Sequence, residues 1–232
     1  MTIDEIKNVL KRSATIFETG GMRPTKDIGE SWIGRVGYRL TREGLPLDAN
    51  GKPMFPVAMF FLGKLPYVPS PLQGIEMLCV YLSESIYDHL VDEDFEGFIE
   101  IREYKPFAGL QECEWTSQHI KPFPLTAKLV EDDYPVWDGF DIPSNVADEI
   151  LQLESKENIE YHNDIAESDY SMHKIGGYGA FCQSGISFGD DYVFVLQISS
   201  DEKACFNIVD GGSFYFYRKY NANDWKVHCD FF

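Results

Sequence analysis

Short apolar segments separated by glycine turns fill the C-terminal third of the chain, and this pattern constrains the fold more than any other. Residues 192–198 are mostly β-branched or aromatic, and so short a run favours a strand over a helix. Asp210-Gly211-Gly212 has the composition of a hairpin turn, and residues 213–217 read as the next strand. We therefore expect a turn–strand–turn–strand unit at the centre of a β-rich core.

The strand predicted at residues 192–198 is apolar on both faces, as in a strand covered on both sides. Strict alternation places Phe194 with Leu196 on one face and Val193 with Val195 on the other. Gln197 is then a buried amide, which must find hydrogen-bond partners or lose roughly 1–3 kcal/mol.

The candidate binding residues lie in and beside this unit, and they are His173, Gln183, Gln197 and Asp210. His173 adjoins a Gly-Gly turn, and a neutral imidazole there is expected to bond a backbone carbonyl. The simpler alternative gives all four residues structural roles. A nucleophilic pair of Cys182 with His173 is the catalytic alternative, although no neighbour in the sequence would activate the thiol.

The same residues carry a family resemblance. The run 173–178, Gln183, the strand residues 196–198 and an Asp-x-Gly turn at Asp210 and Gly212 resemble the YwqG-like family, a bacterial domain family of unassigned function. The resemblance extends to residues 46–54, which match that family's Pro-x-Asp-x-Asn-Gly-x-Pro loop.

Several positions depart from that family's pattern. Ile208 and Val209 stand where Trp and Gly are usual, and Met59 occupies a position that is usually Gln. The resemblance implies a bacterial protein whose relatives are often encoded near toxins, and therefore an immunity or antitoxin-like role.

The sequence predicts one compact domain over residues 1–232, built from two related β modules at about residues 25–104 and 170–232. Ile-Gly precedes a strand in both modules, so we interpret them as a weak internal repeat. The predicted class is α+β, with largely antiparallel sheets, an N-terminal helix and further helices between the two halves.

The helices are predicted from caps and apolar spacing. Thr2-x-x-Glu5 is a capping box, and apolar residues at helical spacing extend the first helix to about Phe17. Residues 105–141 are rich in proline, so only short regular structure is expected there. Helices are expected to begin at Ser144 and again near Glu157.

The net charge of −18 bears on partners. Such a field repels nucleic acid phosphates and anionic membranes, and it attracts a basic protein. Simple solubility is the competing interpretation. No phosphate-binding or dinucleotide motif is present and no histidine pair has metal-ligand spacing, so neither a cofactor nor a metal is predicted.

The cysteine pattern indicates a reducing compartment. The chain has five cysteines with no C-x-x-C spacing, which fits neither a disulfide framework nor a zinc site. The polar N-terminus is not a signal peptide, and a cytoplasmic location is expected.

Two functions follow from the sequence. The first is a non-catalytic protein that caps a basic partner such as a toxin. The alternative is an enzyme or small-ligand receptor that uses a cleft between the two β modules.

Overall fold

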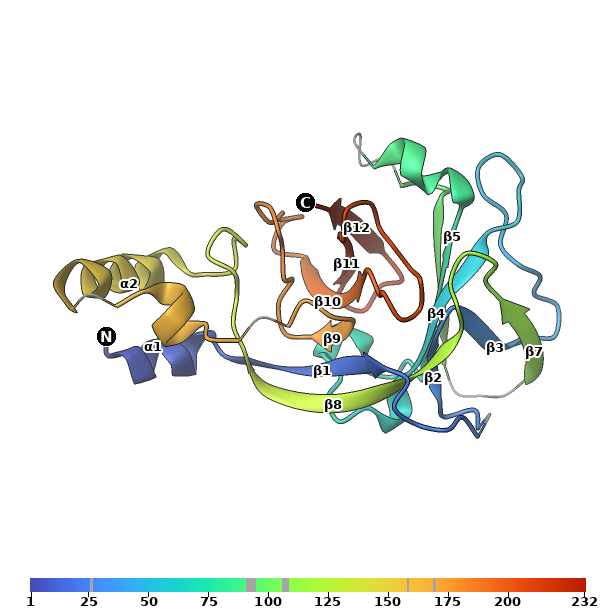
Figure 1. Cartoon of the computed structure of the whole chain (residues 1–232), viewed down its shortest axis with the longest axis horizontal. Coiled ribbons are helices and arrows are strands. Elements are labelled where there is room, and N and C mark those ends of the chain that lie inside the picture. Colours follow the sequence, from blue (N-terminus) through green and yellow to red (C-terminus); the bar gives the residue numbers. More distant parts are fainter. Residues whose placement is uncertain (26, 91–94, 106–108, 158, 169) are drawn as a thin grey trace.

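A computed structural model describes residues 1–25, 27–90, 95–105, 109–157, 159–168 and 170–232 of the protein (Figure 1). In this part of the chain, ten strands form one curled antiparallel sheet. In spatial order they are β12 (Trp225–Asp230), β11 (Ser213–Lys219), β10 (Tyr192–Ser199), β9 (Lys174–Gly176), β1 (Arg12–Thr19), β8 (Phe123–Asp133), β2 (Ser31–Ile33), β4 (Phe55–Phe61), β5 (Met77–Leu82) and β6 (Ile99–Tyr104).

The remaining elements are few and short. A small second sheet pairs β3 (Arg35–Leu40) with β7 (Leu110–Thr116). The helical elements are α1 (Ile3–Leu10), α2 (Ser144–Glu157), 3-10 turns at Leu62–Lys64, Ser70–Leu72 and Glu84–His89, and the π-helical turn η4 (Tyr161–Ile165).

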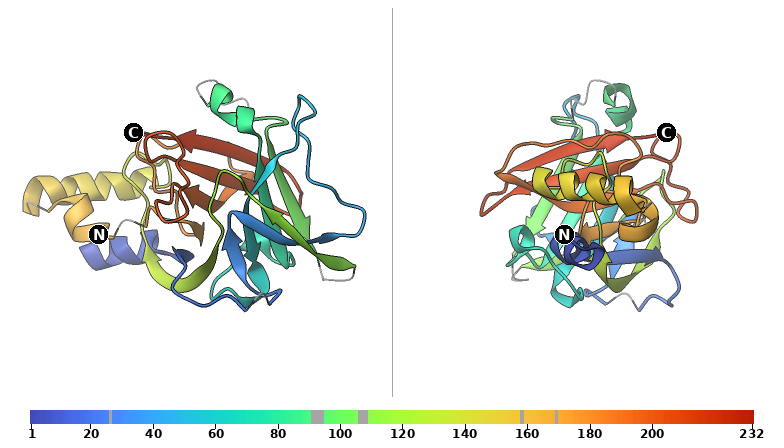
Figure 2. Two further views of the ribbon diagram at one scale, coloured as in Figure 1. Left: turned by 45° about the vertical axis from the view of Figure 1, so that its right-hand side comes forward. Right: turned by 90° about the vertical axis from the view of Figure 1, so that its left-hand side faces the viewer.

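The predicted α+β class with helices between two halves is wrong, because the chain is mostly β and its helices lie at one end. α1, α2 and η4 bury Ile6, Ile150 and Ile165 against one another in a separate apolar cluster. Figures 1 and 2 show this helical lobe beyond the ends of β1 and β8. Neither α1 nor α2 lies between the two sides of the sheet.

The first helix is shorter than predicted. The capping box of Thr2 and Glu5 is present, but α1 ends at Leu10 and the chain continues as β1. β1 pairs with β8 on one side and with β9 on the other. The β-branched pair Thr15-Ile16 is accommodated in a central strand, where pairing on both edges overrides the apolar spacing that favours a helix.

The proline-rich segment 105–141 also differs from the prediction of short regular structure, since it contains β7 and the eleven-residue β8. The prolines occupy tolerated places. Pro124 is the second residue of β8, and Pro135 follows its end. Proline is accepted near strand termini, where a ladder hydrogen bond is not required of it.

β1 and β8 lie side by side at the middle of the large sheet, and each side continues through a three-residue strand. On one side the order is β2, β4, β5 and β6, and on the other it is β9, β10, β11 and β12. The sheet curls so that the inner faces of both sides share one core. That core includes Phe60 and Val80 from one side and Leu196 and Phe216 from the other.

The faces of β10 differ from strict alternation. A register shift between Phe194 and Leu196 inserts an extra residue, Val195. Val195, Leu196 and Ile198 therefore all contribute to the shared core, while Phe194 packs on the outer face. A bulge of this kind changes which side chains point inward after it. Gln197 consequently belongs to the outer face.

Each side of the sheet has a different outer cover. On the β2–β6 side, β3 and β7 cover an apolar cluster that includes Trp32, Met59 and Tyr81. On the β9–β12 side, the cover consists of loops before and after β9, which pack Phe181 and Ile186 against Tyr215 and Tyr217. The candidate site lies under these loops.

Candidate functional site

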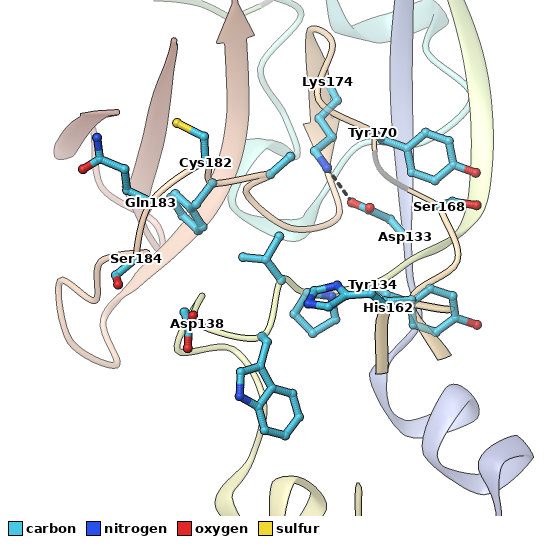
Figure 3. Close-up of a pocket in the computed structure, with 16 residues that line it drawn as sticks. Asp133, Tyr134, Asp138, His162, Ser168, Tyr170, Lys174, Cys182, Gln183 and Ser184 are labelled. Carbon is cyan, nitrogen blue, oxygen red and sulfur yellow. Dashed lines mark hydrogen bonds and ion pairs between the residues drawn. The ribbon is translucent and has the colours of Figure 1, made fainter. Parts of the chain in front are cut away.

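A pocket of about 440 Å³ lies between the outer face of the β9–β12 side and the helical lobe (Figure 3). Four parts of the chain line it: residues 133–138 from the last residue of β8 onward, residues around η4, Lys174 at the start of β9, and residues 180–184 between β9 and β10. Its size is within the range of small-ligand and side-chain pockets.

A buried ion pair forms one wall of this pocket. Lys174 Nζ lies 2.9 Å from Asp133 Oδ2, and the two side chains are 1% and 2% exposed. Asp133 is the last residue of β8 and Lys174 the first of β9, so β1 between them sets the spacing. The same Asp133 oxygen accepts the backbone N–H of Tyr178 at 2.8 Å. The charges are therefore satisfied inside the protein, which such burial requires.

Gly177 makes the close approach to Asp133 possible. Its φ is +68°, and a Cβ at this position would lie 2.0 Å from Asp133 Oδ2. A side chain there would displace the carboxylate from both of its partners. The second glycine of the Gly-Gly turn is therefore required by the ion pair as well as by backbone conformation.

Asp230, the last residue of β12, anchors the loop at 180–184. Its Oδ2 accepts the backbone N–H groups of Cys182 at 2.8 Å and Gln183 at 3.2 Å. Its Oδ1 accepts the hydroxyl of Tyr215 at 2.8 Å. Asp230 is buried, so these hydrogen bonds offset the cost of removing a carboxylate from water.

The Cys182 thiol is not an activated nucleophile. Burial, with a smaller effect from the charge of Asp230, raises its pKa to about 11. His173 interacts with Ser199 and Asp201, so it does not serve this thiol. A thiol with so high a pKa stays protonated near neutral pH, which is unfavourable for nucleophilic catalysis.

Gln197 holds two covering segments against the sheet. It is fully buried, its Oε1 accepts the N–H of Ala180 at 2.9 Å, and its Nε2 donates to the carbonyls of Ser171 and Met172. Nε2 also lies 3.0 Å from the Ser199 hydroxyl. The amide has the partners that its burial demands.

His173 is buried near Gln197 and shares Ser199 with it, but its bonds differ from the prediction. Its Nδ1 accepts the backbone N–H of Ser199 at 3.1 Å, so it does not donate to a carbonyl. Its Nε2 lies 3.3 Å from Asp201 Oδ2. Burial of Asp201 opposes its ionisation, yet hydrogen bonds from His173 and Thr19 hold the pKa of this carboxyl below its ordinary value.

The other two predicted residues lie elsewhere. Gln183 lines the pocket and donates from Nε2 to the carbonyl of Phe231 at 2.5 Å. Asp210 lies in an exposed turn and does not line the pocket. The structure thus joins His173 to Gln197 through Ser199, places Gln183 at the pocket and leaves Asp210 apart.

Sequence reasoning missed the charged residues that build the pocket, which are Asp133, Lys174 and Asp230. Lys174 is part of the motif at 173–178, yet its burial depends on Asp133, which lies 41 positions earlier. Asp230 ends an alternating strand and has no local sign of a special role. That these charged side chains are buried can be recognised only once the order of the strands in the sheet is known.

The pocket offers polar groups and rings for binding. Asp138, Gln183 and Ser184 lie on one side of it, opposite Lys174 and Tyr170 (Figure 3). The Asp138 side chain makes no hydrogen bond with any described residue. Among these residues, no cluster of His, Cys, Asp and Glu has the geometry of a metal site.

Acidic residues are concentrated around this pocket. Residues 131–170 contain thirteen acidic residues and one lysine, a formal charge of −12 out of −18 for the whole chain. This segment includes α2, η4 and one wall of the pocket. Exposed side chains within it include Glu131, Asp132, Asp148 and Glu157. Two thirds of the net charge therefore gathers at one end of the molecule.

Residues 31–223 match the model of a domain of unknown function, DUF1963. The chain belongs to this family. The matched span begins with β2 and ends in the turn before β12, so β1 and β12 lie outside it although both belong to the large sheet. No curated protein matches the chain.

Within the described ranges, no helix combines the length and the apolar character that a bilayer crossing requires.

Proposed function

We propose that this protein is a non-catalytic binding protein whose acidic end receives a basic protein partner. The concentration of charge in residues 131–170 supports this proposal most strongly. A one-sided negative field attracts a basic surface over a distance comparable with the Debye length and orients it before contact.

An exposed aromatic residue adds an apolar contact to the acidic end. Phe140 is 72% exposed and has a φ of +64°, an unfavourable conformation for a bulky side chain. Leu151 on α2 is also exposed. Aromatic side chains among polar residues are common centres of binding energy in protein interfaces, so we assign Phe140 as a contact residue.

The pocket supplies a place for a lysine or arginine side chain of the partner. The Asp138 carboxylate lies beside the pocket, and aromatic rings of Tyr134, Trp137 and Tyr170 line it. A carboxylate together with ring faces suits a cationic group, since both attract positive charge. The positive charge of Lys174 does not prevent a cationic side chain from binding there, because Asp133 forms an ion pair with Lys174.

The resemblance to the YwqG-like family suggests a more specific version of the proposal. In that version the protein is a bacterial, cytoplasmic, immunity-like protein, and its basic partner is a toxin whose surface it caps. The acidic end is compatible with this role because it provides the complementary charge.

Neutralising the acidic end tests the proposal. The test variant carries Glu131→Gln, Asp132→Asn, Asp148→Asn and Glu157→Gln, and the chain is used to capture its partner from cells of its source. We expect the unmodified chain to recover a basic protein in stoichiometric amount, with capture that weakens as salt rises. The variant should lose most of this capture.

A matched control removes the same charge elsewhere. It carries Asp88→Asn, Glu112→Gln, Asp190→Asn and Glu202→Gln, all at exposed positions outside residues 131–170. The control should capture the partner as the unmodified chain does. Equal losses in both variants, or a partner whose binding ignores salt, would contradict the proposed role of the acidic end.

The alternative function, an enzyme or small-ligand receptor with a cleft between the two sides of the sheet, has one observation in its favour. A cavity of about 690 Å³ lies between the edge strands β6 and β12. The predicted residues His173, Gln183, Gln197 and Asp210 do not line it. Its walls are strand edges, which suit a different kind of ligand.

A further inference from the structure

The large sheet ends in two strands that each have one neighbour in the described structure. β6 pairs with β5, and β12 pairs with β11. Because the sheet curls, these two edges come to face each other across the shared core. The sheet resembles a barrel that has not closed.

A buried clamp joins the two edges at one end. Glu103 of β6 accepts bonds from Arg218 Nε at 2.8 Å and Nη2 at 2.9 Å, and the two side chains are each 5% exposed. The indole N–H of Trp225 on β12 donates to the same carboxylate at 2.9 Å. The two-pronged Arg218–carboxylate contact ties β6 to β11, and the Trp225 bond ties it to the edge strand β12, so the two edges are held together at this end.

Away from the clamp, a cleft of about 690 Å³ lies between β6 and β12, and residues of both edge strands line it. The carbonyls of Phe98 and Tyr104 accept the N–H groups of Ser83 and Glu76, which flank β5. The backbone N–H and C=O groups of even-numbered residues in β6 therefore face β5. By alternation, the N–H and C=O groups of Ile99 and Ile101 face the cleft.

The same reasoning applies to β12. The carbonyl of Asp224 accepts the N–H of Lys219, so the backbone groups of even-numbered residues in β12 face β11. The backbone groups of Val227 then face the cleft. Within the described part of the chain, the backbone groups of Ile99, Ile101 and Val227 have no backbone partner. The cleft is thus bounded by two unused rows of hydrogen-bonding groups.

The floor of the cleft is apolar and its rim is charged. Phe95, Ile101 and Val227 pack against the shared core from the floor. Glu100 and Lys226 alternate with these inward residues and face the other way, as strand geometry requires. Charged residues on edge strands discourage self-association, while the half-buried side chains of Ile101 and Val227 leave apolar area between the two edges that an occupant could cover.

We propose that the cleft binds an extended peptide segment of another protein, which adds as a strand between β6 and β12. Such a segment would satisfy both rows of backbone groups at once, as in other strand-addition complexes. Its alternate side chains would be apolar to cover the floor. Its outward side chains would be basic, because Glu96 and Glu100 lie at the β6 rim and the whole chain is acidic, while Lys226 is the one cation among the described residues that line the opposite rim.

The clamp limits the length of this segment. With the Glu103 end closed, residues 99–102 of β6 are available, which is about 13 Å of strand at 3.3 Å per residue. The site therefore suits about four paired residues within a longer peptide. It is separate from the acidic end at residues 131–170, and it does not depend on the function proposed above.

Peptide binding to the full chain tests this proposal. The probe is a fluorescent eight-residue peptide that alternates lysine with valine or isoleucine. One control peptide has the same composition with the lysines in a block, and another carries backbone N-methyl groups at alternate residues. Fluorescence anisotropy should show binding of the alternating peptide, weakened by about ten-fold or more in both controls.

Two proline variants report on the protein edges. Ile101→Pro and Val227→Pro each remove an N–H that faces the cleft and takes no part in the sheet ladder, so the fold should tolerate them. Each should weaken peptide binding by about ten-fold or more. Equal binding of all three peptides, or binding unchanged in folded proline variants, would overturn the proposal.

Amide hydrogen exchange gives a second readout that needs no variant. The amides of Ile99, Ile101 and Val227 should exchange quickly in the free chain and slow by at least about ten-fold with the peptide. Unchanged exchange at these amides would overturn the proposal. Protection that appears with protein concentration alone would also overturn it, because the occupant would then be a second copy of this chain.

Discussion

On one side of the large sheet, Ile33 pairs with Ala58 and Trp32 with Met59. On the other side, Ile175 pairs with Leu196 and Lys174 with Gln197. The short strand of each side thus meets its longer neighbour in the same register. β4 and β10 also share a register shift just before these pairs, between Pro56 and Ala58 and between Phe194 and Leu196.

The difference lies in the outer faces. Trp32 and Met59 belong to an apolar cluster under the small sheet of β3 and β7. Lys174 and Gln197, at the corresponding positions, are buried under loops, where Lys174 pairs with Asp133 of β8 and Gln197 bonds the loops themselves. The same backbone pairing thus supports either a closed apolar layer or a polar layer with a pocket, and the outward-facing side chains decide which of the two forms.

Removing the charge of Lys174 should have the largest effect on stability. Lys174→Met leaves Asp133 as a buried carboxylate without its cation, and such a change costs about 3–5 kcal/mol. Urea unfolding measures the loss. The control is Lys7→Met, whose exposed pairing with Glu167 should contribute less than about 1 kcal/mol. Equal small losses would show that the polar layer does not depend on this pair.

Exchanging the side chains at the corresponding positions sharpens the comparison. Gln197→Met should leave the N–H of Ala180 without its acceptor and should remove a donor from the carbonyls of Ser171 and Met172, at a cost of roughly 1–3 kcal/mol. Met59→Gln should bury an amide in the apolar cluster at a similar cost. Both are measured by denaturant unfolding. If either variant is as stable as the unmodified chain, the polar layer at Gln197 and the apolar layer at Met59 do not require different side chains, which would contradict the comparison.

Acid should weaken the β9–β12 side through Asp201. The pKa of this carboxyl is lowered in the folded state, so the unfolded chain takes up its proton first as pH falls. The stabilisation is fully present above the unfolded pKa of about 4 and is lost progressively as pH falls from there through the lower folded-state pKa. Asp201→Asn should cost roughly 1–2 kcal/mol at pH 7 and flatten the stability curve below pH 4. An unchanged acid dependence would contradict this assignment.

Replacing Cys182 should have the smallest effect on stability, and its thiol should react slowly. Because its pKa is raised to about 11, iodoacetamide should modify it slowly at pH 7.5 and faster above pH 10. Exposed Cys205 serves as the internal comparison in peptide mass spectrometry. Cys182→Ser should change stability by less than about 0.5 kcal/mol. Rapid modification of Cys182 at neutral pH would indicate a thiolate and reopen the catalytic alternative.

The strands β10 and β11 could be predicted from the sequence because local composition and turn chemistry agree there. Phe214 and Phe216 face the core and Tyr215 and Tyr217 the outer layer, as alternation predicts. β1 could not be predicted in the same way. Its apolar residues also fit helical spacing, and its pairing with β8 involves residues more than a hundred positions away.

The candidate site was only partly predictable for the same reason. Gln197 was found because an amide in an apolar strand is unusual wherever the strand lies. Asp133 and Lys174 meet only because β1 lies between β8 and β9, and nothing local to either residue reports this order. The resemblance drew attention to Asp210, whose turn is exposed and separate from the pocket.

Amide hydrogen exchange of the complex with the captured basic partner tests the central claim most directly. If the acidic end receives the partner, exchange should slow in residues 131–170 and 180–184, on the β9–β12 side and the helical lobe, while exchange in β3 and β7 stays unchanged. Slowing confined to β3 and β7 would contradict the account, because the closed apolar side would then be the side that binds.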